Sequence, residues 1–456
     1  MDVPPVDTPV RQAVPPRASL RRRLAAHPVT ILCVLCLFSL MDSVDQGGLT
    51  LVVDRIRRDL ALSHVEASFL LGFASMAVST LVLVPAGILV DMFSRRRLLF
   101  GTGCIWAAMS LTSGLARSFW PLFAARAGGA VADGVLKPAS QSILRDVFPP
   151  ERRGIPFSLY WGFFSLGSGI SFYLSGSLIH AADHGFFAGW PIIGHFRPWQ
   201  IVLALPGLCT LPLTALILLI DEPPRAQPPE NPPGTPDATP ASIAETFTFL
   251  RQYWWLYWPS LAYSVVWSVP NAGFLWTPSV LTESWTIPEA EIGHMIGTLG
   301  IAMSLVGTLG GGALVDMITR RAGPDAAIRI TLVASALMAF VQTLILHVST
   351  HAAIFTLIGM MFTLQGTINA SYYVAIAAIT PGRFMGRMFA LQFLCLSLPG
   401  ALAPTLIAET ARLIRPGDGV RDAMAHAVNL NVGIGSALYL SLLVLFSFRI
   451  YRFRQQ

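Results

Sequence analysis

Twelve long apolar stretches run through the chain, and they limit its fold more than any other feature. A helix needs about 20 apolar residues to cross the hydrocarbon core of a bilayer. The stretches approach or exceed that length, at residues 29–52, 66–90, 98–116, 121–144, 155–180, 198–220, 255–282, 290–315, 328–347, 353–379, 385–411 and 426–449. The sequence therefore predicts an all-α membrane protein with twelve transmembrane helices.

The composition agrees with burial in lipid. Of the 456 residues, 54% are hydrophobic and 12% are charged, against about 25% charged in soluble domains. No G-x-x-x-x-G-K-[ST] phosphate loop occurs, which argues against ATP-driven transport. The longest loop between stretches is Pro-rich and holds no cluster suited to catalysis, so we expect no enzyme. The five cysteines lie in apolar stretches without a second ligand pair, so we expect no metal and no other cofactor.

The basic residues are divided unevenly between the two sides of the predicted helices. If the N-terminus is cytoplasmic, 21 of the 29 basic residues outside the spans lie on that side. Cytoplasmic loops of membrane proteins carry such an excess. We therefore expect both termini to be cytoplasmic. The same bias explains the net charge of +6 without a nucleic-acid partner. Nearly all basic residues are Arg, which is typical of a GC-rich bacterium, so we expect the bacterial inner (plasma) membrane.

A polar, Pro-rich segment from Asp221 to Pro240 divides the twelve stretches into six and six. Such a composition favours an extended linker. We predict five regions along the chain: a disordered cytoplasmic N-terminus at 1–28, a six-helix bundle at 29–220, a cytoplasmic linker at 221–250, a second six-helix bundle at 251–449 and a cytoplasmic tail at 450–456.

A short motif occurs once in each half. The pattern G-x-L-V-D-M-x-[ST]-R-R begins at Gly87, after the second stretch, and again at Gly312, after the eighth. The two copies are 225 residues apart and occupy equivalent places in the two halves. This repeat indicates duplication, with a pseudo-two-fold axis along the membrane normal.

The motif resembles the signature of the major facilitator superfamily, G-x-L-x-D-x-x-G-R-[RK] between spans two and three, with Ser94 at the second Gly. The resemblance covers about residues 30–450 and implies transport by alternating access. It also implies a latch in which Asp91 meets the N-terminus of span eleven in the outward-facing state, where a helix dipole favours a carboxylate. The alternative is that the Arg residues only fix the topology. The latch residues are Gly87, Asp91, Arg95 and Arg96, with the second copy at Gly312, Asp316 and Arg320.

Further segments narrow the resemblance to the bacterial spinster-like branch. They include Met41-Asp42 in span one, Arg126 to Pro138 in span four and the residues that follow span six. The branch carries Asp-Arg in span one and Arg with Glu in span four. Here Ser43 replaces the span-one Arg and Asp133 replaces the Glu, while Lys137 is additional. The branch implies a lysolipid or lipid-like substrate, whereas these changes alter the charges in the predicted cavity.

Five charges lie deep in predicted spans, where a charge at the bilayer centre costs at least about 3 kcal/mol. Helical periodicity brings Arg126, Asp133 and Lys137 onto one stripe of span four, and Asp42 and Asp45 lie in span one. Because three carboxylates outnumber two cations, we expect one carboxylate to bind a proton. Asp133 is the first choice for proton coupling, with Asp42 and Asp45 as alternatives. Arg126 and Lys137 are predicted to bind an anionic or zwitterionic substrate. The competing hypothesis is a purely structural ion-pair cluster.

The second half offers neutral polar and aromatic side chains instead. We predict that these residues line the substrate site: Tyr263, Trp267, Asn271, Gln365, Asn369, Tyr373 and Gln392. The sequence thus favours a monomeric secondary active transporter in the lipid bilayer, with a small organic or amphipathic substrate and with protons as the coupling ion. The alternatives are a lysolipid exporter of the spinster type and a non-transporting membrane receptor.

Overall fold

The structure is a computed structural model, and it describes residues 27–148, 154–191, 193–218, 220–222, 243–322, 325–348, 350–414 and 420–455. Almost all of the predicted disordered N-terminus (1–28) and most of the predicted linker (221–250) lie outside these residues. The described part is helical apart from short connections. The predicted all-α class is therefore confirmed.

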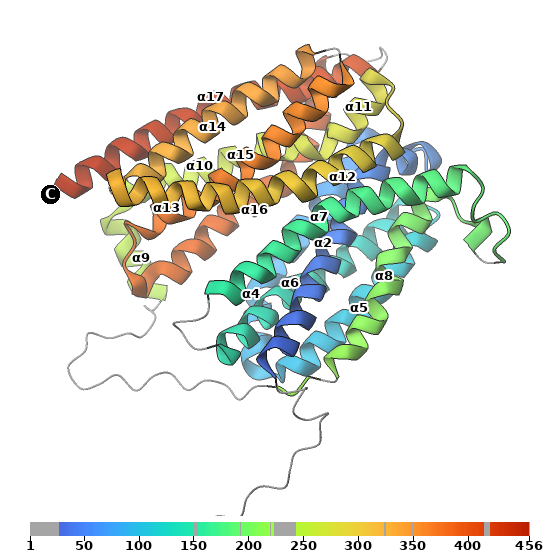
Figure 1. Ribbon diagram of the computed structural model, residues 1–456, viewed down its shortest axis with the longest axis horizontal. Helices are drawn as coiled ribbons and strands as arrows, with labels where there is room; N and C mark the ends of the chain where they lie inside the picture. Colours follow the sequence, from blue (N-terminus) through green and yellow to red (C-terminus); the bar gives the residue numbers. More distant parts are fainter. Residues whose placement is uncertain are drawn as a thin grey trace, which may run out of the picture.

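The first half of the chain forms one helical bundle, the N-bundle (Figure 1). The second apolar stretch is one continuous helical segment whose middle, η1, is π-helical. The elements of the N-bundle are α2 (Pro28–Asp59), α3 (His64–Ser68), η1 (Phe69–Ala77), α4 (Val78–Met92), α5 (Arg95–Leu115), α6 (Phe119–Val147), α7 (Gly154–Asp183), η3 (Ile193–His195) and α8 (Pro198–Ile217).

The second half forms the C-bundle, which repeats this plan. The eighth stretch also contains a π-helical segment, η5, which the 225-residue offset of the repeat aligns with residues 81–85, just after η1. The elements are α9 (Ile243–Gln252), α10 (Trp254–Ala272), η4 (Gly273–Trp276), α11 (Thr277–Trp285), α12 (Glu289–Leu305), η5 (Val306–Gly310), α13 (Gly311–Ala322), α14 (Ala326–Leu344), η6 (Ile345–His347), α15 (His351–Ala377), α16 (Gly382–Ile414) and α17 (Val420–Gln455).

Each of the twelve predicted stretches coincides with one of these helical segments. Among the described residues, ten of the segments are long and apolar enough to cross a membrane. The other two contain α6 and α10, which are less apolar: α6 carries buried charges, and α10 is rich in Trp, Tyr and Ser. The helices extend past two predicted boundaries, since α9 starts at Ile243 and α17 reaches Gln455.

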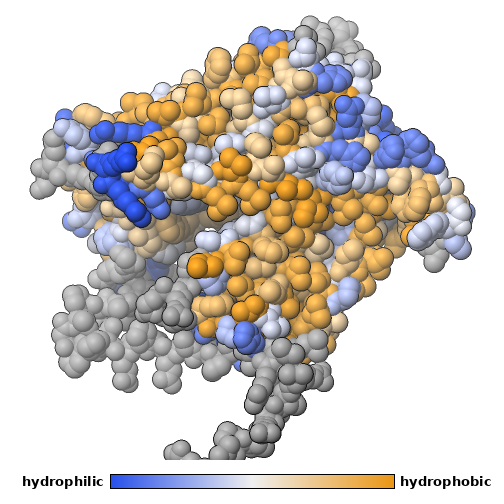
Figure 2. Space-filling model, in the orientation of Figure 1, coloured by the Kyte–Doolittle hydropathy of each residue, from blue (hydrophilic) through white to orange (hydrophobic). Residues whose placement is uncertain are grey.

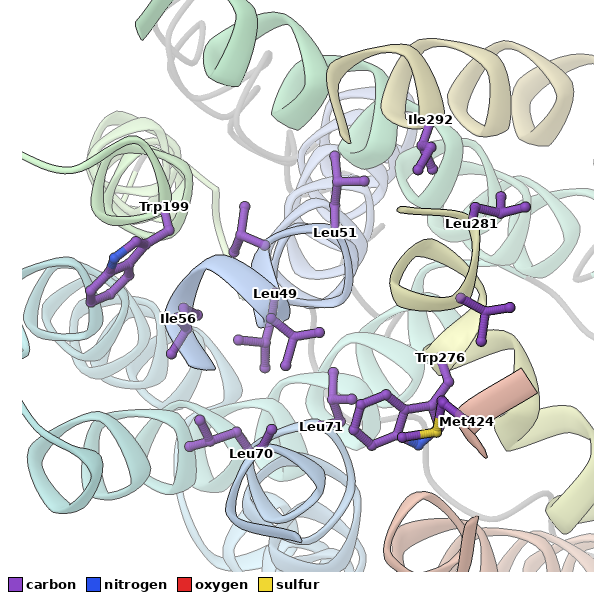
Figure 3. Packing of buried hydrophobic residues seen from close by; sticks show 14 of the residues in the cluster. Leu49, Leu51, Ile56, Leu70, Leu71, Trp199, Trp276, Leu281, Ile292 and Met424 are labelled. Atoms are coloured by element: carbon purple, nitrogen blue, oxygen red, sulfur yellow. The ribbon is translucent and has the colours of Figure 1, made fainter. Parts of the chain in front are cut away.

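The two bundles share one hydrophobic core at one end of the molecule, which we call the closed end. Figure 3 shows Leu49, Leu70 and Trp199 of the N-bundle in the same cluster as Trp276 and Met424 of the C-bundle. The remaining two clusters each belong to a single bundle. The bundles therefore share a hydrophobic core at the closed end, and η1 of the N-bundle also packs against α16 of the C-bundle.

Ion pairs reinforce the closed end. Arg55 and Arg58 of α2 both contact Glu289 at the start of α12, each at 2.7 Å. Arg57 contacts Glu283 of α11 at 3.0 Å. These contacts cross from one bundle to the other at the ends of α2 and α12.

Two helices of opposite bundles also approach closely near the closed end, where Figure 1 shows α7 and α12 side by side. A Cβ added at Gly297 would lie 2.5 Å from the backbone N of Tyr173, and one at Gly293 would lie 2.7 Å from the Cα of Gly176. Only glycine permits backbones to come this near. The crossing therefore depends on the small residues in both helices.

At the opposite end, which we call the open end, the bundles diverge. Figure 1 shows α7 and α12–α13 separating towards the left, and Figure 2 shows the surface hollowed between the bundles there. A Cβ added at Gly87 or Gly312, both near this end, would meet nothing within 4 Å. The molecule thus has a crevice that opens at one end only.

Candidate functional site

The five deep charges come together between α2 and α6, as their spacing predicts, but they divide into two groups. We call Asp45 with Arg126 the buried pair, and Asp42 with Asp133 and Lys137 the charged triad. Asp42 and Asp45 are three residues apart on α2, so their side chains point about 60° apart around the helix axis. Each therefore has different neighbours.

The buried pair lies inside the N-bundle. Arg126 Nη1 is 2.9 Å from Asp45 Oδ2, and the two side chains are only 5% and 7% exposed. Ser110 Oγ donates to Asp45 Oδ1 at 3.0 Å, and Trp106 Nε1 lies 3.5 Å from Asp45 Oδ2. These contacts link α2, α5 and α6. In this conformation the Arg126 guanidinium is engaged by Asp45 and largely inaccessible to a solute.

The charged triad is more accessible. Lys137 Nζ lies 2.9 Å from Asp133 Oδ1 and 3.3 Å from Asp42 Oδ2. Lys137 is 22% exposed and Asp133 is 14% exposed, while Asp42 is 4% exposed. One ammonium between two carboxylates leaves a net charge of −1 when all three are ionised. The triad therefore combines excess negative charge with partial exposure.

Two residues that the sequence did not single out complete the triad. Gln46 Nε2 donates to Asp42 Oδ1 at 2.7 Å and lies 3.4 Å from Asp133 Oδ2. Gln46 follows Asp42 by four residues, so the sequence alone indicates that the two side chains lie on the same helix face. The Lys137 Nζ also lies 5.3 Å from the ring centre of Phe164 on α7. Nothing in the sequence relates Phe164 to Lys137, because the two lie on different helices.

Three of the predicted substrate-binding residues of the second half lie inside the C-bundle. Gln392 is 1% exposed. It accepts hydrogen bonds from Ser264 at 2.7 Å and Tyr372 at 3.0 Å, and donates to Ser260 at 2.9 Å. Tyr263 and Trp267 stack at 5.8 Å and are 2% and 5% exposed. In this conformation they hold α10, α15, α16 and α17 together.

The other four predicted residues are more accessible. Asn271 is exposed near the end of α10. Gln365, Asn369 and Tyr373 follow one another at four-residue spacing on α15, and Gln365 Nε2 donates to Asn369 Oδ1 at 3.2 Å. Asn369 and Tyr373 are exposed. This spacing keeps the three side chains within about 80° of one another around α15.

The two copies of the repeated motif have different surroundings. In the first copy Arg95 is buried and forms ion pairs with Asp146 of α6 and Glu222, while Arg96 donates to the Leu218 carbonyl. In the second copy Asp316 and Arg320 are exposed. The Asp91 side chain lies outside the described part. The start of α16, its predicted partner, packs on α9, where Phe249 and Phe384 stack at 4.2 Å.

Glu222 caps the start of α5. Its carboxylate accepts a hydrogen bond from Ser94 Oγ and one of 2.8 Å from the backbone N–H of Arg95. Partial burial alone would raise the pKa of Glu222, but these hydrogen bonds and the Arg95 charge outweigh it and lower that pKa below its usual 4.5. Glu222, which follows span six, is thereby bound to Ser94 and Arg95 of the motif.

No group of three or more His, Cys, Asp or Glu residues suited to a metal ion occurs in the part of the chain that the structure describes.

Known proteins match the chain along most of its length. The model of the Major Facilitator Superfamily matches residues 32–404. "Protein spinster homolog 3" of Danio rerio is 24% identical over 275 residues, which is 60% of this chain and 51% of that protein. The "Gallate transporter" of Pseudomonas putida is 26% identical over 220 residues, or 47% and 43% of the two chains. The matches thus span about half the length of these relatives.

A solved structure has the same fold. It is described as a bacterial homolog of the human lysosomal transporter spinster, in an inward-facing and unoccupied conformation. The two structures align with a TM-score of 0.78 at 18% identity, over 92% of this chain and 96% of the other.

Proposed function

The chain belongs to the Major Facilitator Superfamily and is a multi-pass secondary transporter, and on this basis we propose that it moves an organic anion together with a proton. Families of this fold bind substrate near the bilayer midplane between two halves that rock against each other. The crevice between the N-bundle and the C-bundle supplies such a place.

The charged triad is the observation that carries the proposal. Asp42 and Asp133 hold Lys137 between them with an excess charge of −1. That excess charge makes the triad a site for one proton. Asp133 is the better candidate because it is 14% exposed against 4% for Asp42. Protonation of Asp133 weakens its hold on Lys137, whose ammonium then becomes available to a substrate carboxylate. Proton and anion therefore favour each other's binding.

The direction of the crevice follows from the charge distribution. Both termini are placed in the cytoplasm because 21 of 29 basic residues outside the spans lie on that side. This orientation puts the closed end outside and the open end inside, so the described conformation is inward-facing. We also place the protein in the inner membrane of a bacterium.

Relatives support an anionic substrate without identifying it. One of them is named as a gallate transporter, and gallate is a carboxylate. Lys137 provides the positive charge that such a group needs. Arg126 is bound to Asp45, so we assign it to the packing of the N-bundle in this state.

Proteoliposomes with an imposed pH gradient test the proposal. Radiolabelled gallate, benzoate and gluconate serve as probes, and the native protein should accumulate at least one of them. Asp133→Asn should abolish accumulation yet keep exchange, because a neutral side chain cannot carry the proton but still leaves Lys137 in place. Lys137→Ala should weaken anion binding by about 1.5–3 kcal/mol, the value of a charged hydrogen bond.

Glu291→Gln provides the matched control, because it removes an exposed carboxylate of α12 far from the triad. It should accumulate substrate like the native protein. The proposal would be wrong if no anion entered the liposomes, or if Asp133→Asn and Asp42→Asn both accumulated substrate normally.

The similarity to spinster proteins supports a second candidate, a lysolipid exporter. Melting temperatures of the purified protein separate the two candidates. Stabilisation by lysophospholipid and not by the three anions would favour the exporter.

A further inference from the structure

Aromatic rings lie beside the charged triad. Lys137 Nζ is 5.3 Å from the centre of the Phe164 ring, and the Trp161 ring meets Phe164 edge to face at 5.7 Å. Trp161 is 42% exposed. A partly accessible ammonium thus has an exposed indole one ring away.

The direction in which Trp161 points follows from a contact between the bundles. Phe172, further along α7, lies 6.0 Å from Phe274 of the C-bundle. Trp161 precedes Phe172 by eleven residues, which is about three turns and leaves the two side chains about 20° apart around the helix. Trp161 therefore lies on the face of α7 that is directed at the C-bundle, nearer to the open end.

The C-bundle has a matching wall. Phe274 also contacts Phe362 of α15 at 5.5 Å. Tyr373 follows Phe362 by eleven residues, so it too lies about 20° from the contact residue and three turns nearer to the open end. Tyr373 is 37% exposed and meets Phe389 of α16 edge to face at 5.6 Å.

The two walls are at similar depth. Eleven residues correspond to about 16 Å along each helix, measured in both cases from the cluster of Phe172, Phe274 and Phe362. Trp161 and Tyr373 are therefore opposed across the crevice at about the same distance from the closed end. Asn369, one turn before Tyr373, adds an exposed amide to the same wall.

We propose that the substrate is an aromatic carboxylate, whose ring lies between Trp161 and Tyr373 while its acid group contacts Lys137. This inference rests on the proposed function and names the chemical class of its anion. Rings favour edge-to-face or offset contacts with other rings. Amides such as Asn369 suit hydroxyl groups on the substrate ring. An aliphatic acid of equal size would fill the same space without the ring contacts.

The closing experiment compares benzoate with cyclohexanecarboxylate, which has the same charge and a saturated ring of similar size. Titration calorimetry on the full chain in nanodiscs should give a tighter Kd for benzoate, by about two- to tenfold per ring contact. Trp161→Leu should lower this preference and leave the Kd for cyclohexanecarboxylate nearly unchanged. Trp161→Phe should retain most of the preference.

Trp120→Leu is the matched control, since Trp120 is 73% exposed near the start of α6 and remote from Lys137. It should keep the native preference. Tyr373→Leu tests the opposite wall and serves if Trp161→Leu does not fold. Equal affinity of the native protein for the two acids would overturn the aromatic inference and leave anion transport intact. Binding of neither acid, together with no uptake of gluconate, would overturn both.

Discussion

The N-bundle and the C-bundle share one plan but organise their interiors in opposite ways. The N-bundle holds five charged side chains between α2 and α6, as a buried pair and a charged triad. The C-bundle interior around Gln392 is held by neutral hydrogen bonds among Ser260, Ser264 and Tyr372. Charges inside a membrane are costly and mark ion pathways. In the proposed function, the proton therefore belongs to the charges of the N-bundle, while the substrate contacts both bundles.

The repeated motif shows the same asymmetry. Arg95 is buried in ion pairs that join α5, α6 and the residue Glu222, whereas its counterpart Arg320 is exposed. Two copies of one sequence pattern therefore contribute differently to the packing of their bundles. The surroundings of a motif therefore decide how much it contributes to stability.

The largest effect is expected from the buried pair. Asp45→Ala or Arg126→Ala should each destabilise the protein by about 3–5 kcal/mol, because either leaves an uncompensated buried charge. The double variant should recover part of this loss. Unfolding in detergent, followed by circular dichroism, measures the three values.

A different outcome would move the buried pair into the transport machinery. If each single variant kept its stability while Arg126→Ala lost anion binding, Arg126 would be a substrate ligand, and the division between pair and triad would be wrong.

Substitutions in the two motif copies should differ clearly in their effect on stability. Arg95→Ala leaves the Asp146 carboxylate buried, and Arg145 at 3.4 Å is its remaining cation among the described residues. We therefore expect a loss at the lower end of about 3–5 kcal/mol. Arg320→Ala should change stability by no more than about 0.5 kcal/mol, as surface substitutions do. Equal melting temperatures for the two variants would contradict the asymmetry.

The neutral network should be worth less than the charges. Gln392→Leu removes one acceptor of Ser264 and Tyr372, which keep the Ser260 carbonyl as an acceptor at 3.2 and 2.8 Å. We therefore expect a loss of about 0.5–1.5 kcal/mol for each hydrogen bond removed. Chemical unfolding compares this variant with Asp45→Ala. A larger loss for Gln392→Leu would reverse the order that the comparison predicts.

The helices were the most predictable part of the structure. Apolar runs of spanning length locate them, because a helix that crosses a bilayer must be both apolar and about 20 residues long. The grouping of Arg126, Asp133 and Lys137 on one stripe also followed from helical periodicity. The split into pair and triad did not, because it depends on whether each Asp of α2 contacts Arg126 or Lys137 of α6.

The C-bundle was harder to predict. Gln392, Tyr263 and Trp267 were expected beside the substrate, and the structure buries all three within the bundle. A polar or aromatic residue in a span suits a cavity and a helix interface equally well. Trp161 gave no signal for the same reason. Only the structure shows that Trp161 contacts Phe164, which lies beside Lys137.

The smallest effect concerns Glu222, which links the N-bundle to the residues leading out of it. Hydrogen bonds from Ser94 and Arg95 lower the pKa of Glu222 below 4.5 despite its partial burial. A lowered pKa means that the ionised form stabilises the fold at neutral pH, and that this contribution is lost as the pH falls through 4.5 and the folded-state pKa. Glu222→Gln should therefore cost about 0.3–1 kcal/mol at pH 7, the usual value of a charge at a helix N-terminus. The difference in melting temperature between the native protein and Glu222→Gln should shrink as the pH is lowered to about 3. Asp221→Asn, at the exposed neighbouring carboxylate, is the matched control. A difference that stayed constant between pH 7 and 3 would mean that the Glu222 side chain acts through its shape, and that the N-bundle motif gains nothing from this charge.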